Sequence, residues 1–129
     1  MSDNRLKCQY IHEEDLPPLA AESQMKHVQR ACELNKARLG QSAKSYTAHR
    51  WRIHESQLRG AILGHIASGK RIFLKFAQDG TRKTMLNHLQ ANVTLLEDLD
   101  IYVEMVLMQS EIIIIYAHDH TLDAPRLPQ

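Results

Sequence analysis

Apolar residues recur at helical spacing in the first half of the chain. The first set is separated by three, four and seven residues and consists of Met25, Val28, Cys32 and Leu39. This spacing predicts an amphipathic helix within residues 19–39, and Gly40 is a plausible stop because glycine readily adopts the left-handed conformation. A second set, formed by Trp51, Leu58, Ile62 and Ile66, predicts a helical stretch over residues 42–67. Ser56 is a candidate N-cap that would divide this stretch and begin a shorter helix over residues 57–66.

The apolar period changes to two after residue 70, which is typical of strands. Residues 71–77 alternate and are followed by Asp79-Gly80, a hairpin turn signal. From Thr84 onwards, one face of a second strand carries Met85, Leu89, Ala91, Val93 and Leu95. The alternative is a helix over residues 82–97, because Leu86, Leu89, Val93 and Leu96 also form a helical stripe. The strand is the preferred interpretation.

Two further strands follow, each next to a short turn. Residues 101–108 carry apolar side chains at every second position (Ile101, Val103, Met105 and Leu107), and residues 111–117 are rich in β-branched side chains. Glu97-Asp98 and Gln109-Ser110 are the turns that these strands predict. Successive antiparallel strands with tight turns close most simply into a barrel. The predicted fold class is therefore α+β, with N-terminal amphipathic helices followed by a small antiparallel β-barrel.

Composition limits the classes of protein to consider. The chain has 129 residues, 43% hydrophobic and 24% charged, and its five glycines and four prolines exclude collagen-like and wholly disordered chains. The longest apolar run, residues 112–117, is too short to cross a membrane, and the polar N-terminus lacks the apolar core of a signal peptide. We therefore expect a cytoplasmic protein without a membrane partner, in which Cys8 and Cys32 are reduced thiols.

Charge is strongly segregated along the chain, although the net charge is only +1. Residues 1–25 hold two basic and five acidic residues, whereas residues 26–83 hold thirteen basic and three acidic residues. Residues 84–129 contain one basic residue, Arg126, and seven acidic residues. A block as basic as residues 26–83 attracts polyanions, although lysines and arginines also serve simply to solvate helix faces.

The end of the chain carries a recognisable series of residues, in which an apolar run ends in Tyr116 and is followed by His118, Thr121 and Pro125. These positions resemble the end of the bacterial Sm-like RNA chaperone family, Hfq. Upstream, the order of a short helix (57–66), a strand ending in Asp79-Gly80 and the segment 99–102 is similar too, so that the likeness covers roughly residues 56–128. The chain departs from the family at Ala117, Ile101 and Asp119-His120, where the family has Lys, Gln and Ala-Ile. It also has a longer segment between Gly80 and Asp100.

The resemblance implies an Sm-like barrel over residues 56–129, after a flexible lead (1–18) and a helical extension (19–55). It also implies a homo-oligomer that binds single-stranded RNA. In that case Tyr102 and His118 would line a nucleotide pocket, because tyrosine stacks on bases and imidazole donates hydrogen bonds. Gln57 would add an amide contact. In the alternative, Tyr102 is a half-buried strand aromatic and His118 is a surface residue.

Six basic residues around the junction of helix and strand are candidates for binding phosphate groups. They are Arg50, Arg52, Lys70, Arg71, Arg82 and Lys83. Trp51 lies between two of these arginines, and basic residues interleaved with an aromatic can hold a nucleic-acid backbone and stack a base. The alternative is a core tryptophan flanked by arginines whose aliphatic stems cover it.

The sequence offers little support for a metal site or for catalysis. His118 and His120 share one face of a strand while Asp119 points to the other, so that at most two good ligands converge, with Asp123 following in the chain, unless His88 or other chains complete the site. Gly60, Gly64 and Gly69 have neither the spacing nor the preceding strand of a phosphate-binding loop. We therefore expect no cofactor, no metal and no catalytic residues.

The expected function is that of a non-catalytic regulatory protein that binds nucleic acid, in the first place RNA, as a homo-oligomer. Self-association is expected because an apolar strand over residues 112–115 would otherwise be an exposed sheet edge. The alternative is a protein-interaction or assembly module, in which the helices over residues 19–39 and 42–66 pair with a partner.

Overall fold

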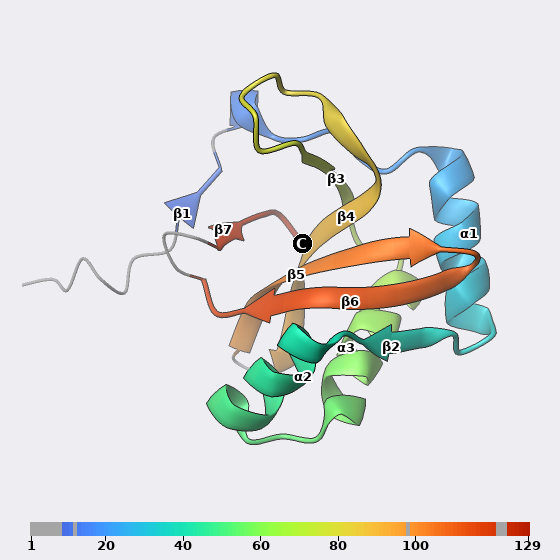
Figure 1. Ribbon diagram of the computed structural model, residues 1–129, viewed down its shortest axis with the longest axis vertical. Helices are drawn as coiled ribbons and strands as arrows, with labels where there is room; N and C mark the ends of the chain where they lie inside the picture. The colour runs from blue at the N-terminus through green and yellow to red at the C-terminus, as the bar shows by residue number, and fades with distance from the viewer. Residues whose placement is uncertain (1–8, 12, 98, 121–123) are drawn as a thin grey trace, which may run out of the picture.

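The computed structural model describes residues 9–11, 13–97, 99–120 and 124–129. The helices and helical turns are η2 (Glu13–Asp15), α1 (Glu22–Glu33), α2 (Gln41–Tyr46), the π-helical turn η3 (Thr47–Trp51) and α3 (Glu55–Ala67) (Figure 1). The strands are β1 (Gln9–Tyr10), β2 (Ala37–Leu39), β3 (Phe73–Phe76), β4 (Thr84–Leu96), β5 (Leu99–Met108), β6 (Glu111–His118) and β7 (Pro125–Arg126). None of the described helices is long and apolar enough to span a membrane.

Five strands form one open, mixed sheet in the order β2-β6-β5-β4-β3. The pairs from β3 to β6 are antiparallel, whereas β2 runs parallel to β6, with Ala37 opposite Ile112. The predicted closed, antiparallel Sm-like barrel is therefore wrong. Residues 37–39, which we expected to end a helix, pair with the last strand of the sheet, so that the sheet is not a closed series of consecutive hairpins.

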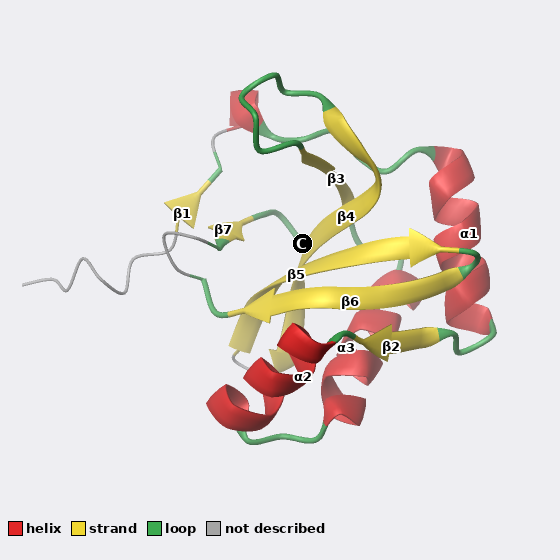
Figure 2. Ribbon diagram, in the orientation of Figure 1, coloured by secondary structure: helices red, strands yellow, loops and turns green. Residues whose placement is uncertain are grey.

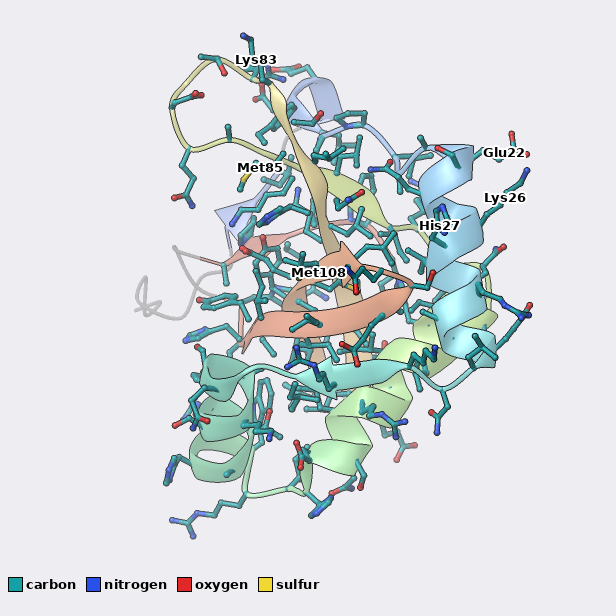
Figure 3. All side chains as sticks on the ribbon, turned by 45° about the vertical axis from the view of Figure 1, so that its right-hand side comes forward. Glu22, Lys26, His27, Lys83, Met85 and Met108 are labelled. Carbon is teal, nitrogen blue, oxygen red and sulfur yellow. The ribbon has the colours of Figure 1, made fainter. Side chains whose placement is uncertain are left out.

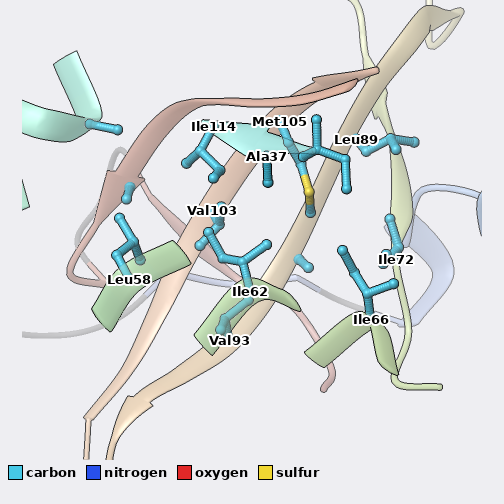
Figure 4. Packing of buried hydrophobic residues seen from close by; sticks show 14 of the residues in the cluster. Ala37, Leu58, Ile62, Ile66, Ile72, Leu89, Val93, Val103, Met105 and Ile114 are labelled. Carbon is cyan, nitrogen blue, oxygen red and sulfur yellow. The ribbon is translucent and has the colours of Figure 1, made fainter. Parts of the chain in front are cut away.

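The main hydrophobic core lies between one face of the sheet and helices α1 and α3 (Figure 2). Helix α3 directs Leu58, Ile62 and Ile66 toward the strands, where they meet Val93 and Val103 (Figure 4). The segment that we expected to be a helical extension thus covers the sheet and supplies its edge strand β2. Its apolar side chains are buried within the chain itself.

The opposite face of the sheet is covered by the two ends of the described chain. Strands β1 and β7 pair in parallel, with Gln9 opposite Pro125. A second small core contains Phe73, Tyr102 and Leu127, and the backbone N–H of Leu127 donates to Asn92 Oδ1 at 2.9 Å. The described part of the expected flexible lead, residues 9–11 and 13–18, therefore includes a strand that pairs with the C-terminal segment.

Helix α1 ends earlier than its apolar spacing predicts. Asn35 has a φ of 57°, and the backbone N–H of Lys36 donates to Ala31 O at 2.8 Å, as in a Schellman motif. Asparagine thus provides the left-handed stop that we expected from Gly40. Gly40 instead has a φ of −71° and begins α2, where a Cβ atom would lie 3.4 Å from Ile114 O.

The second predicted helix is divided, as the candidate cap suggested, although by a different residue. Helix α2 passes into the π-helical turn η3, which ends at Arg52 with a φ of 54°. His54 is the N-cap of α3, and its Nδ1 accepts a hydrogen bond from the backbone N–H of Ser56 at 3.1 Å. The chain therefore turns sharply between two short helices instead of forming one long helix.

The prediction of a strand over residues 84–96 is confirmed, and the alternative helix is excluded. Asn87 has a φ of 59°, which interrupts the alternation and leaves Leu86 82% exposed while Leu89 is 1% exposed. The predicted turn at Gln109-Ser110 is also present, since both residues have a positive φ, as type I′ hairpin turns require. Asp98, in the other predicted turn, lies outside the described residues.

Strand β6 lies inside the sheet between β2 and β5. The expected self-association rested on the assumption that residues 112–115 form an exposed apolar edge. Ile112 and Ile114 are instead 1% and 0% exposed in the core. The structure thus removes that particular reason to expect assembly.

Leu58, which is buried, and Leu86, which is exposed, provide a test of this packing. Leu58→Ala removes a side chain that is fully buried and is expected to lower the free energy of unfolding by about 2–5 kcal/mol. Leu86→Ala, the matched control at an 82% exposed position, should change it by less than about 0.5 kcal/mol. Urea denaturation measures both values, and similar losses in the two variants would contradict the described core.

Candidate nucleic-acid interface

A single carboxylate attaches the π-helical turn to the end of β6. Asp119 accepts hydrogen bonds from Tyr46 Oη at 3.2 Å, Arg50 Nε at 2.9 Å and Trp51 Nε1 at 2.8 Å. A π-helical turn places residues five apart in hydrogen-bonding register, so that the side chains four and five residues after Tyr46 both reach the same acceptor. Asp119 therefore fixes the positions of one guanidinium and one indole at the surface.

Aromatic rings surround this attachment. The Tyr46 ring lies 4.2 Å from the His118 ring, centroid to centroid, and meets Trp51 edge to face at 5.0 Å. His118 also stacks on Tyr116, with centroids 5.6 Å apart and the planes 6° from parallel. His118 therefore contacts two tyrosine rings, and its Nδ1 is 2.9 Å from Asp119 O.

The environment of Asp119 keeps it ionised. Burial alone raises the pKa of this carboxyl, but the hydrogen bonds from Trp51, Arg50 and Tyr46 and the positive charge of Arg50 lower it, and the net shift is downward. The carboxylate is therefore charged at neutral pH and forms an ion pair with Arg50, whose side chain is 63% exposed.

Beside this attachment is an open pocket of about 440 Å³, which we call the Trp51 pocket. Its lining residues are Arg50, Trp51, Leu99, Asp100, Asp119, His120 and Arg126. Arg126 Nη2 lies 3.0 Å from Asp100 Oδ2, so that each arginine is matched by a carboxylate. Burial and the charge of Arg126 lower the pKa of His120, which is neutral at pH 7 as a result. The Trp51 pocket thus combines an apolar wall with polar groups whose charges cancel.

A second hollow, of about 340 Å³, lies between β2, α2 and the start of α3, and we call it the basic cleft. It is lined by Ala37, Arg38, Leu39, Lys44, His54, Glu55, Ser56 and Arg59. Arg59 Nε donates to Ala37 O at 2.8 Å, and Arg59 Nη2 donates to Asn35 O at 3.1 Å and to Asn35 Oδ1. These acceptors are neutral, so they position the guanidinium without cancelling its charge.

The six predicted phosphate-binding residues lie at three separate places in the structure. Arg50, in η3, lines the Trp51 pocket, and the exposed Arg52 directly follows η3. Lys70 and Arg71 follow the opposite end of α3, and Lys83 lies in the loop between β3 and β4, far from α2 (Figures 1 and 3). Arg82, in the same loop, lies 4.9 Å above the Phe76 ring and 3.3 Å from Asp15 Oδ1.

Tyr102 and Gln57, which the Hfq resemblance assigned to a nucleotide pocket, make contacts within the protein instead. Tyr102 is opposite His118 in the sheet but only 2% exposed, and its hydroxyl is 2.8 Å from Gln90 Oε1 and 2.7 Å from Glu104 Oε2. Burial and the charge of Glu104 raise the pKa of Tyr102, so the phenol stays protonated. Its ring has no exposed face for a base. The Gln57 side chain accepts a hydrogen bond from the backbone N–H of His54 and completes the N-terminal cap of α3.

Ion pairs cancel part of the charge separation seen in the sequence. Arg38, Arg50 and Lys75 of the basic block pair with Glu111, Asp119 and Glu104 of the acidic C-terminal block, at 3.1, 2.9 and 2.6 Å. Each of these cations has a nearby countercharge from another part of the chain. The net charge of residues 26–83 therefore overstates the positive charge that a ligand can contact. Near α2, the excess positive charge comes from Lys44, Arg52 and Arg59.

Sequence reasoning missed several residues of this surface. Arg38, Lys44 and Arg59 belong to the basic block but are not among the six candidates, because only the pairing of residues 37–39 with β6 brings β2 beside α2 and α3. Arg126 was noted only as the single cation of the C-terminal block. Asp119 was considered as a metal ligand, whereas its oxygens accept three hydrogen bonds. Within the described residues no group of three or more His, Cys, Asp or Glu is arranged to hold a metal ion, and Asp123 lies outside them.

Comparisons with protein-family models, with curated proteins and with solved structures find no match to this chain. They therefore provide no support for the resemblance to Hfq and no evidence against it. Arguments about function rest on the geometry of the chain itself.

Removing the shared carboxylate tests the attachment of η3. Asp119→Ala deprives three donors of their acceptor and should lower the free energy of unfolding by about 1–3 kcal/mol. Asp119→Asn keeps an oxygen acceptor and should cost about half as much. Glu97→Ala, at an exposed turn position, is the control with an expected change below about 0.5 kcal/mol. Urea denaturation followed by tryptophan fluorescence gives these values, and equal stability of all four proteins would contradict the role of Asp119.

The lowered pKa of Asp119 also predicts a pH dependence. A carboxyl whose pKa is lower in the folded state stabilises the fold above its unfolded pKa, near 3.8, and loses this contribution as the pH falls through the folded value. The difference in unfolding free energy between the parent protein and Asp119→Asn should therefore be full at pH 7 and shrink below about pH 4. A difference that grows on acidification would contradict this assignment.

Proposed function

We propose that this chain is a non-catalytic, cytoplasmic protein that binds single-stranded nucleic acid, in the first place RNA, through the surface around α2. The contact area, here called the basic surface, consists of Arg38, Lys44, Arg50, Arg52 and Arg59. The basic surface extends from the basic cleft, which Lys44 of α2 lines, to the Trp51 pocket, which Arg50 and Trp51 of η3 line.

The observation that carries this proposal is the set of hydrogen bonds made by Arg59. Its three acceptors, Ala37 O, Asn35 O and Asn35 Oδ1, are all uncharged, so that a fixed guanidinium keeps its positive charge inside a hollow. The exposed Lys44 lines the same hollow, where Glu55 is the single carboxylate lining residue. Oxygens of a phosphate group are the acceptors that such a pair of cations favours.

Charge on the basic surface exceeds that of its surroundings. Its five cations face three carboxylates, Glu55, Glu111 and Asp119, two of which are the ion-pair partners of Arg38 and Arg50. The surplus is concentrated on a chain whose total formal charge is only +1. Phosphate contacts of this kind supply affinity through counterion release and make binding depend on salt.

The shape of the region favours a single strand over a duplex. Helix α2 has only six residues, and the chain turns sharply at Arg52 before α3 begins. A nucleic-acid strand that contacts both hollows has to bend around this short helical segment. A duplex resists such bending, because its persistence length is about 150 base pairs.

The protein-interaction alternative has less support from the structure. It required the apolar faces of the first helices to be available, but Val28 of α1 and Leu58 and Ile62 of α3 are fully buried against the sheet. Self-association likewise cannot be argued from β6, because this strand is internal. We therefore propose nucleic-acid binding by the individual chain.

Charge removal on the basic surface tests the proposal. Fluorescence anisotropy with a labelled single-stranded RNA should show binding that weakens steeply between about 50 and 200 mM salt. Lys44→Ala and Arg52→Ala should each weaken binding and reduce the slope of log affinity against log salt by about 1. Lys26→Ala, on the outer side of α1 and remote from α2 (Figure 3), is the control that should leave the slope unchanged.

Two outcomes would contradict the proposed function. One is the absence of RNA binding at about 50 mM salt. The other is an equal effect of Lys26→Ala and Lys44→Ala, which would indicate attraction by total charge instead of a local surface. Tight binding of an acidic protein with no binding of RNA would favour the interaction module instead.

A further inference from the structure

The two hollows on either side of α2 and η3 differ in their electrostatics. The basic cleft has a surplus of positive charge, held by Arg59 and Lys44. In the Trp51 pocket, by contrast, Arg50 is paired with Asp119 and Arg126 with Asp100. A nucleic-acid strand that lies across both hollows therefore meets a site suited to a phosphate group in the basic cleft. The Trp51 pocket is not suited to one.

We propose that the Trp51 pocket accepts one unstacked nucleobase of the strand whose phosphates contact the basic surface. This inference rests on the proposed function and names the part of the ligand that the pocket selects. A base is uncharged and planar, with hydrogen-bond donors and acceptors along its edge, whereas a phosphate group is charged and offers acceptors.

The volume and walls of the pocket fit a base. Its volume of about 440 Å³ lies within the range of about 300–1,000 Å³ that is typical of small-molecule sites. Trp51 and Leu99 supply apolar surface, and the indole N–H of Trp51 already donates to Asp119. The indole is therefore held in place before a ligand arrives, which reduces the entropy lost when a base packs against it.

The polar groups of the pocket are positioned as well. Asp119 accepts a hydrogen bond from Arg50 Nε, and the Arg50 side chain is 63% exposed beside the pocket. A guanidinium held in this way can stack on a base or donate to its acceptors. At the opposite wall, Asp100 pairs with Arg126 and accepts from Thr94 Oγ1 at 2.8 Å.

A phosphate group is a poor occupant of the same pocket. It would lie near the carboxylates Asp100 and Asp119, and it would compete with them for the two arginines. His120 adds no positive charge at neutral pH. The phosphates of a bound strand instead have the exposed Arg52 and the basic cleft close by.

The tryptophan of the pocket provides the readout, because Trp51 is the only tryptophan in the chain. Adenosine and uridine, which carry no phosphate, should change its fluorescence in a saturable manner. Inorganic phosphate at the same concentrations should not. Nucleoside binding should vary less than about twofold between about 50 and 200 mM salt, whereas RNA binding falls steeply over this range.

Two neighbouring arginines separate the pocket from the rest of the basic surface. Arg50→Ala should weaken nucleoside binding at least tenfold, with folding verified by circular dichroism. Arg52→Ala, the matched variant outside the pocket lining, should weaken RNA binding but leave the nucleoside titration unchanged. An RNA strand should also bind more tightly than an abasic strand of equal length and charge, and Arg50→Ala should reduce this difference.

The possible failures are distinguishable. If RNA binds and responds to Lys44→Ala but nucleosides leave Trp51 fluorescence unchanged, the base pocket is wrong and the proposed function stands. If phosphate changes the fluorescence as nucleosides do, the assignment to a base is likewise overturned. If nucleosides bind in the Arg50-dependent manner but RNA does not bind, the pocket is a nucleoside site and the proposed function fails.

Discussion

The surface chemistry of this chain depends on one carboxylate that satisfies three donors. Tyr46, Arg50 and Trp51 come from a short helical segment that has little core of its own, and Asp119 connects them to the end of an internal strand. Without that acceptor, the partly buried indole N–H of Trp51 and phenol of Tyr46 would lose this partner, at a cost of about 1–3 kcal/mol in all. The same bonds orient the guanidinium and the indole outward, so that one interaction both stabilises the turn and shapes the pocket.

Charge illustrates how the fold changes the meaning of the sequence. Along the chain, a basic block is flanked by two acidic ones, which suggests a large cationic surface. In the structure, Arg38, Arg50 and Lys75 pair with carboxylates of the C-terminal block, and Arg82 pairs with Asp15 of the N-terminal block. The separation therefore serves partly to hold distant segments together. What remains for a ligand is a small surplus around α2, organised by Arg59 and its neutral acceptors.

Local patterns predicted the parts of the structure that local physics determines. Alternation identified β4, and the Gln109-Ser110 turn was predicted from its place between two apolar runs, where both residues adopt a positive φ. The three residues of β2 are too few for a pattern, and they become a strand only because Ile112 and its neighbours pair with them. The role of Arg59 was equally hidden, since its acceptors lie in a helix end and a strand that only the fold brings near α3. Tyr102 was expected to contact a ligand, but the C-terminal segment that buries it has no periodicity to reveal its position.

The parallel pairing of Ala37 with Ile112 has a consequence for biosynthesis. On the ribosome, where chains grow at about 5–20 residues per second, β2 emerges well before the strand to which it bonds. Helices α1 and α3 meanwhile have no complete sheet to cover, so their apolar faces stay accessible to chaperones and proteases. The pairing of β2 with β6 is therefore made late, after β6 has left the exit tunnel, and nascent chains that stall earlier are candidates for degradation.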